Sequence, residues 1–247
     1  NIICTDKTGT LTENRMTVSN YEMEGRSVEI TGTGLDTQGK FLCEGEGKNK
    51  PDDLVLKESL EIGVLCNNAS FKEYDGKKEI RGDPLEVSLL IAGIKGGIER
   101  DRLLEQMPES KEVSFDPTVK MMATYHKKEG GFKVAIKGAP EKVLESSTKV
   151  MTSNGVKELT PDQKEIWEQK NERMAKDGLR ILALAKKEVE STDEEPYEDL
   201  TFVGLVGMLD PPRKEVKSAI KKCQSAGIRV VMVTGDHAIT AGAIARE

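Results

Sequence analysis

Two short apolar segments near opposite ends of the chain each run into a turn that carries an aspartate. "IIC" precedes "DKTGT" at the start of the sequence, and "IRVVMV" precedes "TGD" close to its end. Helical patterns flank the second segment, which is the element order typical of a parallel α/β sheet. Because ligands bind at the carboxyl edge of such sheets, we expect Asp6 and Asp236 to lie in one site there.

The sequence between these two segments predicts a different kind of structure. Asp75-Gly76 and Gly130-Gly131 each separate strand-like segments, as in hairpins. A helix is expected from Thr160, with Pro161 at its first position and Gln163 completing a capping box. Further helices are expected over residues 53–69, 83–94 and 139–147. Hairpins mixed with helices predict an antiparallel α+β region inserted into the α/β domain.

Other segments of the middle region are assigned from composition and from apolar runs. "RILALA" and "FVGLVGML" predict buried strands, and residues 15–33 alternate weakly, as strands do. Residues 34–52 are rich in Gly, Lys, Asp and Glu and are expected to form a loop.

Composition excludes several classes of protein. The 247 residues are 36% apolar and 32% charged, which is typical of a globular domain. The net charge of −6 and the aromatic content of 4% both disfavour a nucleic-acid partner. No apolar run approaches the roughly 18–20 residues that cross a bilayer. The four cysteines form no CxxC pair, so a zinc site is disfavoured and a reducing compartment is favoured.

The first turn, "DKTGT", allows two interpretations from its residues alone. A carboxylate at a strand end can attack phosphorus to form an aspartyl phosphate, and it can also bind Mg²⁺. Gly9 lets the backbone direct N–H groups toward a phosphate. The same residues also suit an aspartate-capped turn with no chemistry. Residue types do not decide between these interpretations.

Four motifs in order carry a family resemblance. "DKTGTLT", "KGAPE", "DPPR" and "TGD" resemble the P-type ATPases, ion pumps of haloacid-dehalogenase-like fold that form an aspartyl phosphate, and the similarity runs from Asp6 to the last helical pattern. "NRMTV" and "MVTGDHAITAGAIA" are similar to the type II cation pumps. The resemblance implies a partial Rossmannoid phosphorylation domain, residues 1–14 and 210–247. Inserted into it is a large nucleotide-binding domain of antiparallel sheet and helices, residues 15–209.

The resemblance implies roles at the phosphorylation site. Asp6 is similar to the phosphorylated aspartate, Lys7 would neutralise charge beside it, and the Thr8 carbonyl would join Asp6 in holding Mg²⁺. Many phosphatases of this fold have a second aspartate at the position of Thr8, acting as general acid and base. A threonine cannot do that proton transfer, so the acyl phosphate is expected to persist. The residues expected to cradle and close the phosphoryl site are Thr234, Gly235 and Asp236.

The resemblance also implies a nucleotide site in the middle region. Phe115 matches a phenylalanine that stacks on adenine, and Lys120 matches a lysine that follows it. Lys137 and Gly138 would line the adenosine pocket. The alternatives are a core role for Phe115 and solvated strand-end positions for the lysines.

Two further residues extend this predicted nucleotide site. Arg180 matches an arginine that meets the polyphosphate, where a guanidinium fork suits phosphate oxygens, although it too could be a solvated strand-end charge. Glu86 matches a polar contact near the adenine. The family usually has threonine before that glutamate, and Leu85 stands there instead, which weakens the assignment of Glu86.

"DPPR" is expected to form the hinge between the two domains, because two prolines restrict the backbone. Its residues are Asp210, Pro211, Pro212 and Arg213. Asp210 and Arg213 could also reach the phosphorylation site. The alternative is a rigid connector with no contact to that site.

The family's later motifs and its membrane helices are not in this sequence, so the chain is expected to be part of a longer membrane protein, on the cytoplasmic side. The expected cofactors are ATP and Mg²⁺, and the expected partner is the membrane domain of the parent chain. We expect this piece to bind ATP without turnover. Two alternatives remain, a soluble phosphatase of the same fold with a large cap and a nucleotide-binding module with no chemistry.

Overall fold

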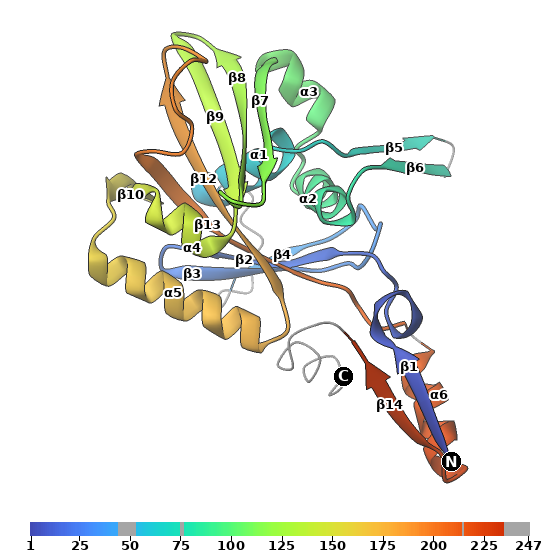
Figure 1. Ribbon diagram of the computed structural model, residues 1–247. Coiled ribbons are helices and arrows are strands. Elements are labelled where there is room, and N and C mark those ends of the chain that lie inside the picture. The colour runs from blue at the N-terminus through green and yellow to red at the C-terminus, as the bar shows by residue number, and fades with distance from the viewer. Residues whose placement is uncertain (44–52, 75–76, 214, 235–247) are drawn as a thin grey trace.

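A large, mainly antiparallel sheet dominates the computed structural model, which describes residues 1–43, 53–74, 77–213 and 215–234 (Figure 1). Among these residues its ten strands are joined in the order β4-β3-β2-β13-β12-β9-β8-β7, with β10 against β13 and β11 against β10. Neighbours are antiparallel except β10 and β13, which are parallel. The strands are β2 (Thr17–Met23), β3 (Arg26–Ile30), β4 (Phe41–Cys43), β7 (Glu109–Asp116), β8 (Met121–Lys128), β9 (Gly131–Gly138), β10 (Ser147–Thr152), β11 (Gly155–Glu158), β12 (Arg180–Val189) and β13 (Leu200–Leu209).

Helices cover both faces of this sheet. On one face lie α1 (Leu54–Leu65) and α2 (Pro84–Lys95), with α3 (Arg100–Gln106) packed against α1. On the other lie α4 (Pro140–Glu145) and α5 (Pro161–Lys176). Side chains alternate between the faces, so Leu184 joins the core under α1 and α2, whereas Ala183 and Ala185 join the core under α4 and α5. The sheet therefore separates two hydrophobic cores.

The predicted capping signals are confirmed. The Thr160 hydroxyl accepts the Gln163 backbone N–H at 3.3 Å and the Gln163 side chain accepts the Thr160 N–H at 3.0 Å, which completes the capping box of α5. Asp83 caps α2 by accepting the Leu85 N–H at 2.8 Å. The hairpin predicted at residues 75–76 is present as β5 (Ser70–Tyr74) and β6 (Lys77–Arg81), although the two turn residues lie outside the described part.

The loop predicted over residues 34–52 is partly wrong, because β4 lies inside it. Phe41 is buried there, and β4 pairs with β3 from Val28↔Cys43 to Ile30↔Phe41. A strand of three residues is too short to show the alternation of apolar and polar residues that marks a strand. Its polar neighbours therefore made the whole segment resemble a loop. Four further elements were not predicted from the sequence, namely α3, β7, β10 and β11.

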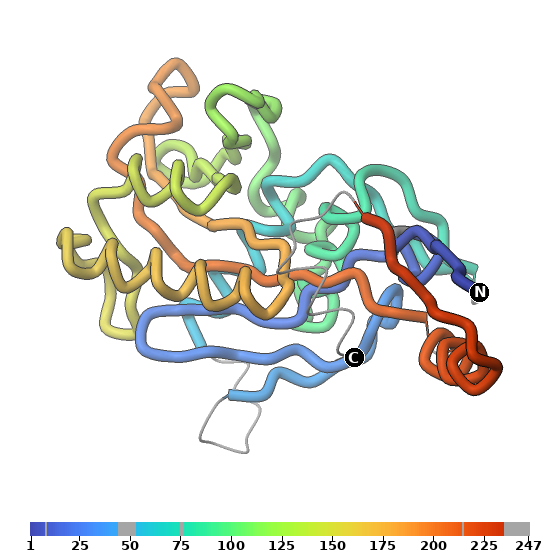
Figure 2. The backbone as a smooth tube through the Cα atoms, turned by 60° about the horizontal axis from the view of Figure 1, so that its bottom comes forward, coloured from blue at the N-terminus to red at the C-terminus, as the bar shows by residue number. Residues whose placement is uncertain are grey.

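A second, smaller sheet joins the two ends of the described chain. β1 (Ile2–Asp6) and β14 (Arg229–Val233) pair in parallel, from Ile2↔Arg229 to Asp6↔Val233, as the sequence predicted. Helix α6 (Val216–Ser225) packs on β14. Figures 1 and 2 show β1, β14 and α6 grouped at one end of the molecule, apart from the large sheet. None of the described helices has the length and apolar content needed to span a membrane.

Candidate functional site

A buried ion pair joins two of the predicted nucleotide residues. The Lys137 ammonium on β9 donates to Glu86 Oε1 at 2.5 Å and to the Cys66 carbonyl at 2.6 Å. The side chain of Lys137 is 8% exposed and that of Glu86 is 13% exposed. Because a buried charge is costly unless it is paired, each side chain holds the other in place. The structure thus brings Glu86 and Lys137 together despite Leu85.

Two side chains that sequence reasoning missed connect this pair to β7. The Asn68 backbone N–H donates to Glu86 Oε2 at 3.2 Å, and its side-chain amide donates to Glu112 Oε1 at 2.9 Å. The Ser114 hydroxyl donates to the same oxygen at 2.6 Å. These hydrogen bonds, from Ser114 first and Asn68 second, lower the pKa of Glu112. Glu112 is therefore held as a carboxylate near Lys137.

Phe115 lies on β7 close to this cluster and is not a core residue. Its side chain is 58% exposed, which excludes the core alternative. Val113 pairs with Ala123 and Asp116 with Met121, so Ser114 and Phe115 together oppose the single residue Met122. A bulge of this kind breaks the alternation of the strand and re-aims a side chain. The bulge leaves a large aromatic surface open to a ligand.

The turn after Phe115 is fixed by close backbone contacts. Lys120 has a positive φ of 57°, and its carbonyl accepts the Ala139 N–H at 3.0 Å. A Cβ placed on Gly138 would stand 2.6 Å from that carbonyl, so only glycine fits. The Lys120 ammonium lies 3.3 Å from Glu141 Oε1 in an exposed pair. Lys120 and Gly138 therefore meet beside Lys137.

Arg180 lies farther along the same end of the sheet. It begins β12 and is exposed, three residues before Ala183, which pairs with Gly138. Apart from Glu86, which lies on α2, the predicted nucleotide residues thus share one end of the strands β7, β8, β9 and β12. Arg180 stands at the border of this group rather than among the clustered side chains.

The predicted phosphate acceptor ends β1. Asp6 is exposed and in register with Val233, so Asp6 and Thr234 follow neighbouring parallel strands at one edge. Residues Lys7–Leu11 form one wide turn, which the Thr12 N–H closes on the Lys7 carbonyl at 3.0 Å. The backbone turn also contains Thr8. Gly235 and Asp236 lie outside the described residues.

The "DPPR" segment is hydrogen-bonded to the chain just after this turn. Asp210 accepts the Thr12 hydroxyl at 2.5 Å and the Arg15 N–H at 3.1 Å. The Pro211 carbonyl accepts the Glu13 N–H, and Pro212 bridges to Thr12.

Arg213, the last residue of "DPPR", contacts the wide turn itself. Its guanidinium donates to the Gly9 carbonyl at 2.9 Å, and its backbone N–H donates to the Leu11 carbonyl at 2.9 Å. The segment is therefore more than a connector, because it supports the turn that carries the predicted acceptor.

No group of three or more His, Cys, Asp or Glu side chains suited to a metal ion occurs within the described ranges, which exclude Asp236. The predicted Mg²⁺ ligands that the described ranges include are the Asp6 carboxylate and the Thr8 carbonyl. Oxygen donors of this kind suit Mg²⁺, which usually takes one or two protein carboxylates and completes its shell with water and phosphate.

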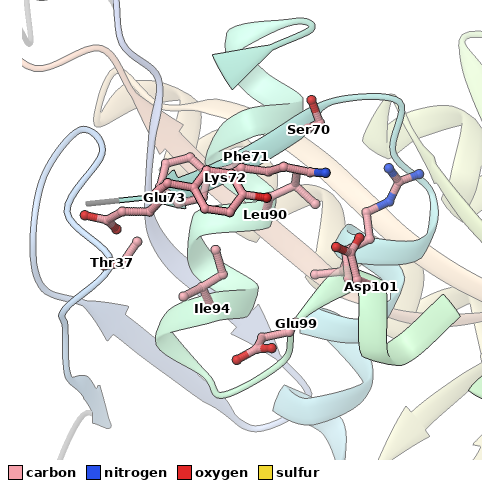
Figure 3. A pocket seen from close by; sticks show the side chains of 12 residues that line it. Thr37, Ser70, Phe71, Lys72, Glu73, Leu90, Ile94, Glu99 and Asp101 are labelled. Carbon is pink, nitrogen blue, oxygen red and sulfur yellow. The ribbon is translucent and has the colours of Figure 1, made fainter. Parts of the chain in front are cut away.

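A separate cavity of about 390 Å³ lies between α2, α3 and the β5–β6 hairpin. Figure 3 shows Leu90 and Ile94 of α2, Phe71 of β5 and Asp101 of α3 around it. The residues that line it include none of the predicted nucleotide residues.

Comparison with known proteins identifies the class to which this fold and site belong. The family model described as "P-type ATPase, cytoplasmic domain N" matches residues 55–215. The chain therefore belongs to the P-type ATPase family, and the matched region is its cytoplasmic domain N.

Relatives of known name are similar over the whole chain. A calcium-transporting ATPase of Bacillus subtilis is 35% identical over 100% of this chain and 28% of its own length. The cation-transporting ATPase pma1 of Synechocystis is 38% identical over 100% of the chain and 28% of its own length. The sodium/potassium-transporting ATPase alpha subunit of Hydra vulgaris is 35% identical over 99% of the chain and 25% of its own length. The chain thus spans about a quarter of the length of these relatives, whose names are those of transporting ATPases and not of phosphatases.

Proposed function

We propose that this chain is the ATP-binding part of a cation-transporting P-type ATPase, together with part of its phosphorylation domain. The observation that carries the proposal is the gathering of Phe115, Lys120, Lys137 and Gly138 at one end of β7, β8 and β9. The match of the domain N family to residues 55–215 supports it.

In this proposal the base of ATP stacks on the exposed ring of Phe115. Lys137 stands at the polar edge of the base, where Glu86 keeps its ammonium in place at 2.5 Å. Lys120 and Arg180 would attract the phosphates, since both are exposed cations at the same end of the sheet. Arg180 offers the planar fork that pairs with phosphate oxygens.

The proposed reaction of the whole protein begins at Asp6. A carboxylate oxygen of Asp6 attacks the γ-phosphorus of ATP, the bond to the β–γ bridging oxygen breaks, and ADP leaves with that oxygen. The exposure of Asp6 beside Thr234 at a parallel-strand edge supports this role. Mg²⁺ held by Asp6 and the Thr8 carbonyl would offset phosphate charge. Thr8 offers no proton-transferring carboxylate, so water would hydrolyse the aspartyl phosphate slowly.

The proposed domain boundaries follow the two sheets. Residues 1–14 and 210–247 would form the partial phosphorylation domain, of haloacid-dehalogenase-like fold, and residues 15–209 the nucleotide-binding domain. The contacts of Asp210 with Thr12 and Arg15 support a hinge at this boundary. In the parent protein a membrane domain of the same chain would carry the transported cation.

The test of the nucleotide site is Phe115→Ala. Base stacking on an aromatic ring contributes roughly 1–3 kcal/mol per base, so ATP affinity is expected to fall about five- to a hundredfold. Titration calorimetry measures it. Tyr74→Ala is the matched control, because Tyr74 is an exposed aromatic residue at 62% on a different hairpin. Equal ATP affinity in wild type and Phe115→Ala would reject the stacking role.

The test of the phosphorylation proposal uses γ-labelled ATP. We expect this chain alone to bind ATP without trapping label on Asp6, since the family's later motifs are not in the sequence. Label that is stable to acid and lost in Asp6→Asn would contradict this expectation.

A further inference from the structure

Asn68 connects two carboxylates that flank Lys137. Its backbone N–H bonds Glu86 at 3.2 Å, and its side-chain amide bonds Glu112 at 2.9 Å. Asn68 follows the C-terminal end of α1, so a helix end, the edge strand β7 and the start of α2 are joined at one residue. The family resemblance gave Asn68 and Glu112 no role.

Glu86 and Glu112 differ in how many of their carboxylate oxygens already accept a hydrogen bond. Glu86 uses both oxygens, Oε1 for Lys137 and Oε2 for Asn68. Glu112 receives two donors on Oε1, from Asn68 and Ser114, and its Oε2 has no hydrogen-bond donor within the described ranges. Glu112 is also partly exposed, three residues before Phe115. Within the described ranges Glu112 Oε2 therefore has both acceptor sites open to a ligand stacked on Phe115, whereas each Glu86 oxygen already accepts one hydrogen bond.

The chemistry of purines makes this oxygen selective. Adenine carries an amino donor at its six position, whereas guanine and hypoxanthine carry an acceptor oxygen there. An ionised carboxylate only accepts hydrogen bonds, so it matches the amino group and repels the oxygen.

We propose that Glu112, held in place by Asn68 and Ser114, makes the nucleotide site select adenine over 6-oxopurines. Glu112 would contact the base, whereas Asn68 and Ser114 are positioning residues that fix the direction of its free oxygen. The inference rests on the proposed ATP-binding function and names a specificity determinant for it.

The experiment compares ATP and ITP binding to the 247-residue chain by titration calorimetry. Wild type is expected to prefer ATP. Glu112→Gln keeps the size of the side chain but adds a donor that can bond the oxygen of hypoxanthine. Because a hydrogen bond to a charged group is worth about a factor of ten or more in affinity, the ATP-to-ITP ratio should fall about tenfold.

Variants of the positioning residues Asn68 and Ser114 provide a second test if the Glu112→Gln chain does not fold. Asn68→Ala and Ser114→Ala should each lower the ratio in the same direction by a smaller factor, and Ser114 is exposed enough to be changed without loss of packing. Glu158→Gln is the matched control, an exposed glutamate on β11 that should leave the ratio unchanged. Melting curves check that each variant is folded.

The outcomes separate the two proposals. If Glu112→Gln binds ATP but keeps the wild-type ratio, Glu112 does not select the base and the inference is wrong while the proposed function stands. If folded wild type binds neither nucleotide, the proposed function fails and the inference fails with it. An ATP-to-ITP ratio near one in wild type also overturns the inference alone.

Discussion

The large sheet and the small β1–β14 sheet differ in how they hold their predicted functional residues. Eight of the ten residues of β13 are buried, whereas β1, β14 and α6 contain no buried residue. Lys137 lies on the neighbouring part of this sheet in β9, whose last six residues are buried. Asp6 is held mainly by the hydrogen-bonded turn and by "DPPR". A binding site can thus rest on a core while the predicted acceptor rests on a few polar contacts.

The strongest test of this difference removes one apolar side chain from each region. Phe202 is fully buried, and its ring centroid is 4.8 Å from that of Trp167. Phe202→Ala should lower the free energy of unfolding by about 3–5 kcal/mol, because a cavity remains. Ile3→Ala in β1, where Ile3 is 42% exposed, should cost less than about 1 kcal/mol. Urea denaturation followed by circular dichroism measures both, and equal losses would contradict the comparison.

A buried ion cluster gives a second test. Lys133 on β9 bonds Glu58 at 2.6 Å and Glu61 at 3.0 Å, with its side chain 8% exposed. Lys133→Met removes the nearest cation from two carboxylates, which keep only the longer pairs with Lys186 and Lys57, and should cost about 3 kcal/mol. Lys142→Met breaks an exposed pair with Glu145 and should change the free energy of unfolding far less. A Lys133→Met chain as stable as Lys142→Met would show that the cluster contributes little.

The burial of His126 on β8 should make the free energy of unfolding depend on pH. Burial lowers the pKa of His126 from 6.5 to about 4, and its ring nitrogens already bond Met107 and Thr124. The unfolded chain therefore binds a proton between pH 6.5 and about 4 that the folded chain does not, so stability is complete above pH 6.5 and falls as pH drops through this window. His126→Gln should show a shallower decline in the same unfolding titration. Parallel curves for wild type and variant would reject this.

The smallest expected effect is local to the "DPPR" segment. Asp210→Ala removes the acceptor for the Thr12 hydroxyl and the Arg15 N–H. A lost hydrogen bond is worth about 1 kcal/mol, so amides of residues 9–15 should exchange hydrogen about fivefold faster. Amides of β8 and β9 should keep their wild-type rates, as measured by exchange mass spectrometry. Faster exchange throughout the large sheet would mean that the two regions unfold together.

Local signals in the sequence predicted the elements whose residues carry the evidence themselves. The capping box at Thr160 predicted α5, and the apolar run around Phe202 predicted β13. The pairing of β1 with β14 followed from the rule for parallel strands. β7 was missed because an edge strand with mostly exposed residues has no apolar alternation.

The residues of the candidate site also fall into two groups, those that sequence motifs pointed to and those that only the tertiary structure brings together. Motif similarity pointed to Lys137 and Phe115, and their roles remain predictions. Asn68 and Glu112 have the polar character of any solvated loop or edge residue. Only the packing of α1 against the sheet brings them beside Lys137, from sequence positions 44 residues apart. A contact of that kind depends on tertiary structure and has no local pattern.

The paired crossings at "DPPR" limit how the two regions can move relative to each other. If the chain passed only once between the two regions, they could rotate relative to each other about that single connection. Here two passages run side by side, joined by the Thr12–Pro212 bridge and by Arg213 to Leu11. Two passages joined in this way resist twisting more than a single passage would. A movement of Asp6 toward the proposed nucleotide site at Phe115 would therefore bend the chain at these two passages with little rotation about its axis.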